Sequence, residues 1–295
     1  MARSRPDERE ANAILDDAAA AYTRAFGDRL IASYALGSLA HGGFSPLVSD
    51  IDLGLILSDP AHDRDADRVG AIADQMRTGG SALHERLSVF WGTPSTLTGA
   101  SEGGRFPPLD RLDLIQNGRL LAGSDVRAGL PAPGARELLM VGAEFALEFL
   151  AGIAGGSATA SRGLGSIRPA TSDTSAEIRH PELLLSRGVR RVTKIVLFPV
   201  RFLFTAETGQ VGTNDHAVAH YLTRADTPSK PLVQAALAWR REAPADAPAT
   251  RALLGDQLVP LYLYFIDDHI GRLTSAGRQD LADAFTTWRT QLGPP

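Results

Sequence analysis

Two aspartates, Asp50 and Asp52, stand on either side of one apolar residue in the segment SDIDLGLIL. Side chains two residues apart on a β-strand point to the same face, so a strand here would project both carboxylates together. Two adjacent carboxylates repel each other, and burying them without a counter-ion is costly. Their oxygen atoms suit Mg²⁺ or Mn²⁺, which proteins often hold through one or two carboxylates plus substrate phosphates. The pair therefore predicts a divalent metal site.

A glycine-serine pair, Gly37 and Ser38, directly follows the apolar run LIASYAL. Glycine lets the backbone approach a ligand closely, and a serine hydroxyl with free amide groups can bind phosphate oxygens. Metal ions beside bound phosphates neutralise the attacking and leaving oxygens in phosphoryl or nucleotidyl transfer. Gly37 and Ser38 are therefore predicted to bind the nucleotide, and Asp50 and Asp52 to be catalytic as metal ligands.

Strands and helices must position these groups, and the apolar spacing indicates where they are. Apolar runs at 30–36 and 51–57 are typical of buried strands, and RLSVFW predicts a third strand. Amphipathic helices are predicted over 7–26 and 66–76. The later segments predict an all-helical second half, with helices over 109–121, 135–150, 181–208, 213–222, 231–241 and 253–273. A stretch rich in Gly, Ser, Ala and Thr, 155–174, predicts a loop.

Composition narrows the class of protein. Of the 295 residues, 44% are hydrophobic and 22% charged, which is typical of a globular chain of one large or two ordinary domains. The 34 acidic and 30 basic residues are too balanced to indicate a broad nucleic-acid surface. The absence of cysteine excludes disulfides and thiolate metal sites. No signal-peptide pattern and no apolar run of about 18 residues is present, so a cytoplasmic protein without a membrane partner is expected.

Three short segments share the pattern of a known superfamily: LGS at 36–38, HGG at 41–43 and SDIDL at 49–53. Together they resemble the signature of the DNA polymerase beta-like nucleotidyltransferases. Within that superfamily the chain looks like the two-domain adenylyltransferases that modify streptomycin and spectinomycin. The resemblance implies an α+β fold, with a nucleotidyltransferase domain over 1–130 that has a mixed sheet flanked by helices. A C-terminal all-helical bundle is then expected over 131–295.

A second similarity lies in RFLFTAETG and the GTND that follows it. In the family, an arginine and a lysine of this segment contact the ATP phosphates. The arginine carries over as Arg201, whereas Asn214 stands at the lysine position. Lys194 would lie on the same helical face as Arg201 if the helix continues through Pro199. Arg201 and Lys194 are therefore predicted to bind phosphate, with a solvated basic stripe as the alternative.

The family also has a third acidic residue on the next core strand, as a metal ligand or a base. Here Ser88 occupies the most natural position in RLSVFW. Glu85 lies at the edge of this strand. By the alternation of side chains it would point to the same face as the apolar residues, so it needs a twist or bulge to reach the site. It is retained as a catalytic candidate. Asp110 and Asp113 are rival donors whose ordinary roles would be helix capping and surface solvation, and Arg105 lies in a loop that could reach a phosphate.

The resemblance and the metal site together predict a nucleotidyltransferase. It would transfer NMP, with AMP from Mg-ATP as the default, to a hydroxyl of a small-molecule acceptor such as an aminoglycoside-like compound, releasing pyrophosphate. One alternative keeps this chemistry with a protein or tRNA acceptor, as in nucleotidyltransferase toxins of toxin-antitoxin systems. Another is a catalytically silent nucleotide sensor, which the missing third carboxylate favours.

Overall fold

The computed structural model describes residues 6–153, 174–245 and 247–293. The chain divides into two compact units, which we call the N-terminal unit (Met1–Pro133) and the helical unit (Gly134–Pro295). The loop predicted over 155–174 lies outside the described residues except for Thr174.

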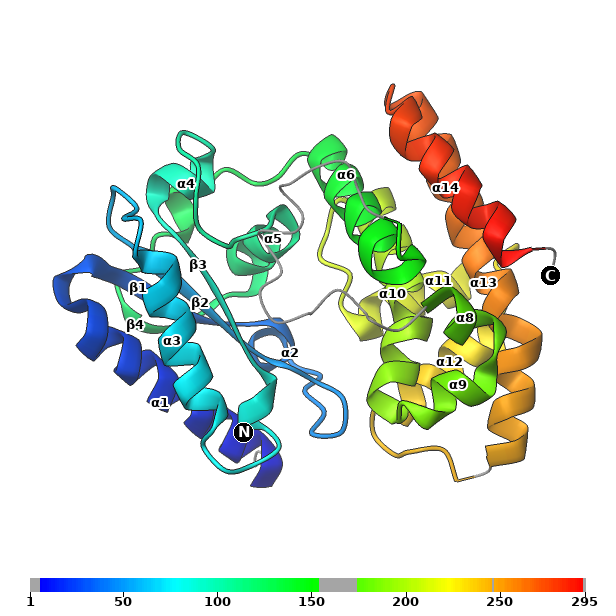
Figure 1. Ribbon diagram of the computed structural model, residues 1–295, viewed down its shortest axis with the longest axis horizontal. Coiled ribbons are helices and arrows are strands. Elements are labelled where there is room, and N and C mark those ends of the chain that lie inside the picture. Colours follow the sequence, from blue (N-terminus) through cyan, green and yellow to red (C-terminus); the bar gives the residue numbers. More distant parts are fainter. Residues whose placement is uncertain (1–5, 154–173, 246, 294–295) are drawn as a thin grey trace. The chain divides into compact units, whose positions relative to one another are not determined.

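The N-terminal unit is built on a mixed four-stranded sheet with the strand order β3-β2-β1-β4 (Figure 1). The strands are β1 (Leu30–Leu36), β2 (Ile51–Leu57), β3 (Leu87–Gly92) and β4 (Arg119–Gly123). Strand β1 pairs antiparallel with β2 and with β4, whereas β2 and β3 run parallel. The predicted mixed sheet flanked by helices is thereby confirmed.

Helices cover both faces of this sheet. On one face, α1 (Pro6–Phe26) and α3 (Asp65–Arg77) pack on β2 and β3 through a core that includes Ile14, Tyr22, Leu53, Leu55, Val69 and Val89. On the other face, α4 (Pro94–Thr98) and α5 (Pro108–Asn117) contribute Leu97 and Leu114 to a smaller core with Tyr34, Leu36, Ile56 and Phe90. Because both faces are covered, β2 is apolar at nearly every position, and a charged residue within it needs a specific explanation.

Strand β4 is the element that the sequence pattern missed. A single helix over 109–121 was expected, but α5 ends at Asn117 and an extended Gly118 begins the turn into β4. A side chain at Gly118 would lie 2.5 Å from the carbonyl oxygen of Leu114, so glycine is needed for this close turn. The predicted helix is therefore wrong beyond residue 117. The remaining short elements are α2 (Gly37–His41), η1 (Gly27–Arg29), η2 (His84–Arg86) and η3 (Arg127–Gly129).

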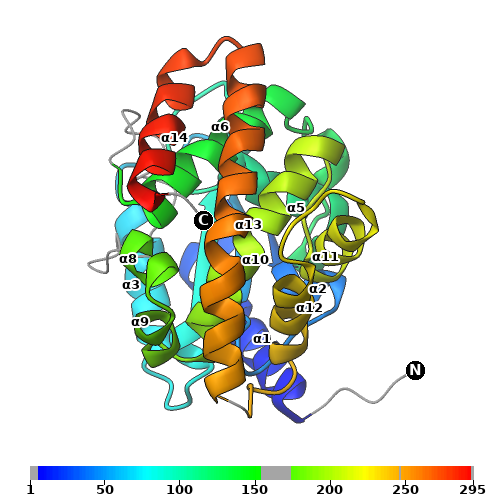
Figure 2. The same ribbon diagram turned by 90° about the vertical axis from the view of Figure 1, so that its right-hand side faces the viewer.

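The helical unit contains only helices among its described residues, as predicted. They are α6 (Ala135–Phe145), the π-helical turn η4 (Ala146–Ala151), α8 (Thr174–Arg179), α9 (Pro181–Ser186), α10 (Val189–Thr208), α11 (Asn214–Thr223), α12 (Lys230–Trp239), α13 (Ala247–Ser275) and α14 (Gln279–Leu292). Figure 2 shows the long α13 within this unit, with α10 and α14 packed against it.

Two details of the helical unit differ from or extend the sequence pattern. The helix expected over 181–208 is divided into α9 and α10 at Gly188, whose φ of 84° is unfavourable for other residues. Helix α10 itself continues through Pro199. None of the helices formed by the described residues is both long and apolar enough to cross a membrane.

Candidate functional site

The two aspartates lie where β2 begins. Asp50 immediately precedes the strand and Asp52 is its second residue. Of the seven residues of β2, Asp52 alone is not buried. Its register partners are Leu36, the last residue of β1, and Ser88 of β3. The half-buried carboxylate therefore stands where β1 ends and where β2 and β3 start.

Gly37 lies directly against Asp52. Its φ is 60°, a conformation that side chains other than glycine adopt at a cost. A Cβ on Gly37 would also overlap the Oδ2 atom of Asp52. The positive φ favours glycine here, and a side chain would also force the Asp52 carboxylate to shift. The predicted phosphate-binding turn and the predicted metal ligand are therefore in contact.

Asp113 of α5 holds this turn in place. Its Oδ2 atom accepts a hydrogen bond of 2.6 Å from the Gly37 amide, while its Oδ1 atom accepts one of 2.9 Å from Asn117 Nδ2. Only 8% of Asp113 is exposed. Sequence reasoning offered Asp113 as a rival third carboxylate, but no pattern linked it to a glycine 76 residues away. The Ser38 hydroxyl makes no hydrogen bond with a residue that the structure describes.

The connection between α2 and β2 is held by its own hydrogen bonds and by an arginine. The Ser49 amide donates to the Ser45 carbonyl at 2.9 Å, and the Ser45 amide donates to Ser49 Oγ at 3.0 Å. Arg86, which precedes β3, donates from Nη1 to the Pro46 carbonyl at 2.5 Å. These contacts fix the segment that ends at Asp50, so the first aspartate is placed by a closed turn and by the neighbouring strand.

Ser88 occupies the position nearest to Asp52 on β3. It is the one residue of that strand that is not buried, whereas Leu87, Val89 and Trp91 belong to the core beneath the opposite face. Glu85 lies in η2, is exposed, and forms no hydrogen bond or ion pair with a residue the structure describes. Its proposed catalytic role stays a prediction. Within the described ranges, no three His, Cys, Asp or Glu side chains gather as a metal site.

Arg105 is a charged residue of this site whose position was not evident from its loop. It is 9% exposed, and burial lowers the pKa of its guanidinium. The carboxylates of Asp110 and Asp52 oppose that effect because they favour the positive form. The loop arginine is thus a buried cation on the side of the sheet that carries Asp52.

In the helical unit, α10 carries both predicted phosphate-binding cations. Because α10 is continuous through Pro199, Lys194 and Arg201 are two turns apart and share a face. The Nε atom of Arg201 donates to the Gly212 carbonyl at 2.5 Å, which ties the turn between α10 and α11 to this arginine. Asn214, at the position of the family's lysine, is the first residue of α11.

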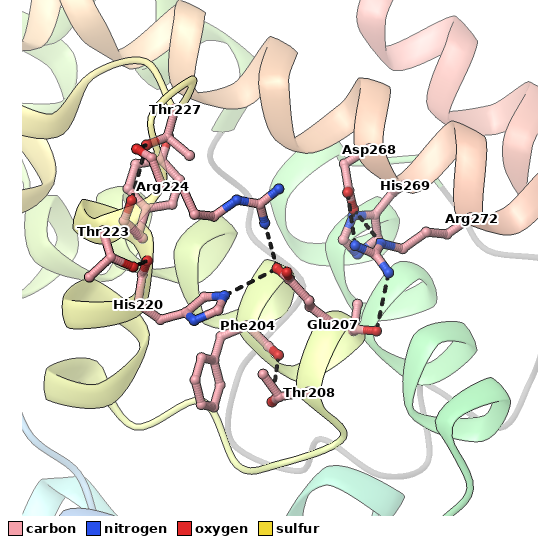
Figure 3. Close-up of polar contacts among 12 residues, drawn as sticks. Phe204, Glu207, Thr208, His220, Thr223, Arg224, Thr227, Asp268, His269 and Arg272 are labelled. Atoms are coloured by element: carbon pink, nitrogen blue, oxygen red, sulfur yellow. Dashed lines mark hydrogen bonds and ion pairs between the residues drawn. The ribbon is translucent and has the colours of Figure 1, made fainter.

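A polar cluster holds the end of α10 (Figure 3). Glu207 accepts from Arg224 and lies 3.2 Å from His220 Nε2. On the other side, Arg272 pairs with Asp268 at 2.8 Å and donates to the Ala206 carbonyl at 3.4 Å. These contacts connect α10 with α11 and α13, so we assign the cluster a structural role in fixing the helix that carries Arg201.

Comparisons with known proteins give a distant likeness. No protein-family model matches the sequence, and no curated protein sequence matches it. Among solved structures, the spectinomycin adenyltransferase AAD(9) from Enterococcus faecialis with ATP and spectinomycin is 12% identical, with a TM-score of 0.48. The alignment covers 86% of this chain and 98% of that one. At this identity and TM-score, the comparison assigns neither an activity nor a substrate to this chain.

Proposed function

We propose that this protein is a nucleotidyltransferase that transfers a nucleoside monophosphate, AMP from ATP by default, to a hydroxyl of a small-molecule acceptor. The observation that carries the proposal is the contact between Gly37 and Asp52, with Asp50 immediately before the strand that carries Asp52. It joins a turn suited to phosphate with a pair of carboxylates suited to a cation. An ordinary turn beside a solvated strand edge does not need glycine to make room for a carboxylate.

The residues present fit Mg²⁺ or Mn²⁺. Asp50 and Asp52 supply two carboxylates, and the space that a Cβ of Gly37 would fill lies at Asp52 Oδ2. Such a donor set needs further oxygen ligands, which phosphates and water provide. When bound there, the ion would neutralise charge on the phosphates and favour attack on the α-phosphorus.

Each residue then has a defined task. Asp50 and Asp52 would hold the metal, and Ser38 would donate its hydroxyl to a phosphate oxygen. Asp113 keeps Gly37 in the conformation that leaves room beside Asp52. Arg201 and Lys194 of α10 are proposed to bind phosphate oxygens through their charges. In the transfer, the acceptor hydroxyl oxygen bonds to the α-phosphorus, the bond to the bridging oxygen breaks, and pyrophosphate leaves. Glu85 is the proposed acceptor of the hydroxyl proton.

A nucleotide sensor without transfer activity is the second candidate function. The observation that favours it is Ser88, because the position beside Asp52 on β3 carries a hydroxyl in place of a carboxylate. A transferase that acts on a protein or a tRNA is a further variant. It differs from the main proposal only in which molecule receives the nucleoside monophosphate.

The deciding experiment follows the α-phosphate. The protein is incubated with NTPs labelled at the α-phosphorus, Mg²⁺, and separate panels of aminoglycosides, tRNA and cell lysate, and pyrophosphate release is measured alongside label transfer. We expect label on a small molecule and an equal amount of pyrophosphate. Metal-dependent ATP binding without any label transfer would support the sensor. Label on tRNA or protein would show that the acceptor is a macromolecule and not a small molecule.

A further inference from the structure

Arg105 is attached to the outer edge of β3. Its amide donates to the Trp91 carbonyl at 2.7 Å, and the Trp91 amide donates to the Arg105 carbonyl at 3.0 Å. The preceding Gly104 has a φ of 77°, and a Cβ there would lie 2.8 Å from the Trp91 oxygen. This backbone bridge fixes where the arginine side chain starts, so its position does not depend on a free loop.

The side chain turns back over the strand. The guanidinium carbon lies 4.6 Å from the centroid of the Phe90 ring, and Nη1 donates a short hydrogen bond to the Val89 carbonyl. Phe90 is two residues beyond Ser88 and therefore shares its face. It is also the register partner of Gly54, which is two residues beyond Asp52. The guanidinium thus lies one row of side chains away from the pair formed by Asp52 and Ser88.

A buried guanidinium requires an opposite charge nearby, because transfer of an ion out of water is costly. For Arg105 the opposing groups are Asp110 and Asp52. One of the two is a carboxylate that the proposed function assigns to the metal. Arg105 therefore neutralises part of the negative charge that would otherwise attract cations to this place.

We infer that Arg105 supplies a fixed positive charge to the site, so that Asp50 and Asp52 bind a single divalent cation and no second one. Ser88 and Arg105 both disfavour a second metal ion. Ser88 provides a hydroxyl and no third carboxylate beside Asp52, and Arg105 places a positive charge one row further along the same face. Two metal ions next to two carboxylates and a guanidinium would meet strong mutual repulsion. The inference rests on the proposed metal site and adds its stoichiometry and a residue that sets it.

The test counts Mn²⁺ ions bound to the full-length protein by electron paramagnetic resonance, with and without a non-hydrolysable ATP analogue. We expect one Mn²⁺ per chain for the wild type. Arg105→Gln should tighten Mn²⁺ binding about fivefold by removing a neighbouring like charge. Ser88→Asp should bind a second Mn²⁺, because a carboxylate then faces Asp52 on the adjacent strand.

Arg68 is the matched control. It also donates to a backbone carbonyl, that of Ala25 at 2.5 Å, and lies 5.0 Å from an aromatic ring, that of Phe26, but it belongs to α3 on the opposite face of the sheet. Arg68→Gln should leave Mn²⁺ affinity unchanged. If Arg105→Gln does not fold, Arg105→Lys keeps the charge and should bind one Mn²⁺ with wild-type affinity.

Each outcome has a defined meaning. Two Mn²⁺ per wild-type chain, or an affinity that Arg105→Gln does not raise, would overturn the inference while leaving the metal site intact. No Mn²⁺ bound by the wild type in either condition would overturn the proposed metal site itself, and the inference with it. A single Mn²⁺ that is lost in Asp52→Asn, together with tighter binding in Arg105→Gln, is the result we expect.

Discussion

Asp52 and Ser88 are register partners on the parallel strands β2 and β3, and each is the one residue of its strand that is not buried. Neighbouring strands are about 4.8 Å apart, so the two side chains lie side by side on one face. The site thus has one carboxylate on β2 and no carboxylate opposite it on β3. A carboxylate and a hydroxyl therefore lie next to each other on these two strands.

The first prediction concerns the two aspartates. Asp50→Asn and Asp52→Asn should each lower the affinity for Mg-ATP at least about tenfold, because an amide is a much weaker ligand for Mg²⁺ than a carboxylate. Calorimetric titration with ATP in Mg²⁺ and in EDTA measures the effect, and the loss should disappear in EDTA. Equal Mg-ATP affinity in both variants and the wild type would exclude the metal site.

Glu85 can be tested separately from metal binding. Glu85→Gln should lower kcat about a hundredfold if this carboxylate takes the hydroxyl proton, which is within the usual range for general bases. Mg-ATP affinity should stay the same, because Glu85 lies outside β3 in η2. Ser88→Ala is the comparison, and we expect little change in kcat from it. If kcat is unchanged in Glu85→Gln, the proton of the acceptor hydroxyl is transferred to solvent and not to Glu85.

Gly37 is predicted to be intolerant of any side chain. Gly37→Ala should destabilise the protein by more than about 2 kcal/mol, since it combines a left-handed backbone with overlap on Asp52. Gly27→Ala is the matched control, because its φ of 54° is similar but nothing lies within 4 Å of its Cβ position. Chemical denaturation of both variants separates the two contributions. Equal losses would mean that the overlap is relieved by movement of Asp52.

Asp65 predicts a dependence of stability on pH. Hydrogen bonds from Arg29, 2.8 and 2.9 Å long, hold the pKa of this carboxyl below its usual range. A lowered folded-state pKa means that the stabilisation is present above the unfolded pKa, about 4, and is lost as the pH falls through the folded value. Asp65→Asn should therefore cost about 2 kcal/mol near neutral pH.

The measurement is the free energy of unfolding of wild type and Asp65→Asn at a series of pH values. The difference between the two proteins should be constant near neutrality and should shrink below about pH 4. A difference that does not depend on pH would show that the ion pair contributes nothing through its charge.

Arg201 and Arg272 allow phosphate binding to be distinguished from helix positioning. Both arginines donate to backbone carbonyls around α10, Arg201 to Gly212 and Arg272 to Ala206. Arg201→Ala should weaken ATP binding at least about fivefold, because a charged hydrogen bond to phosphate is lost. Arg272→Ala should leave it within about twofold. Similar losses in both would show that Arg201 acts through the turn it holds.

Local patterns in the sequence predicted most of the fold. Helix α1 and strands β1, β2 and β3 follow from apolar spacing, because each buries a regular set of side chains. Strand β4 was not predicted because its residues are exposed or half-buried at the sheet edge. The two leucines of RLLAG instead seemed to continue the helical apolar spacing of α5. The end of α5 depends on one close approach at Gly118, which spacing does not reveal.

Sequence reasoning could group the candidate residues that are close together in the chain, and their roles stay predictions. Gly37, Asp50 and Asp52 belong to one short stretch of chain, and only Asp52 lies within a strand, where the apolar pattern of β2 places it. The bond from Gly37 to Asp113 joins residues 76 positions apart, and the place of Arg105 over Phe90 depends on a backbone bridge to Trp91. Such long-range contacts leave no periodic signal, so neither role could be derived from the chain alone.

The bridge between Arg105 and Trp91 also covers part of the free edge of β3. Strand β3 is at the edge of the sheet, and an uncovered edge with free amide and carbonyl groups can pair with a strand of another molecule. The backbone of Arg105 forms hydrogen bonds with the amide and the carbonyl of Trp91, and its side chain donates to the Val89 carbonyl. A bulky residue at Gly104 would displace this cover, so its first visible effect would be aggregation during expression.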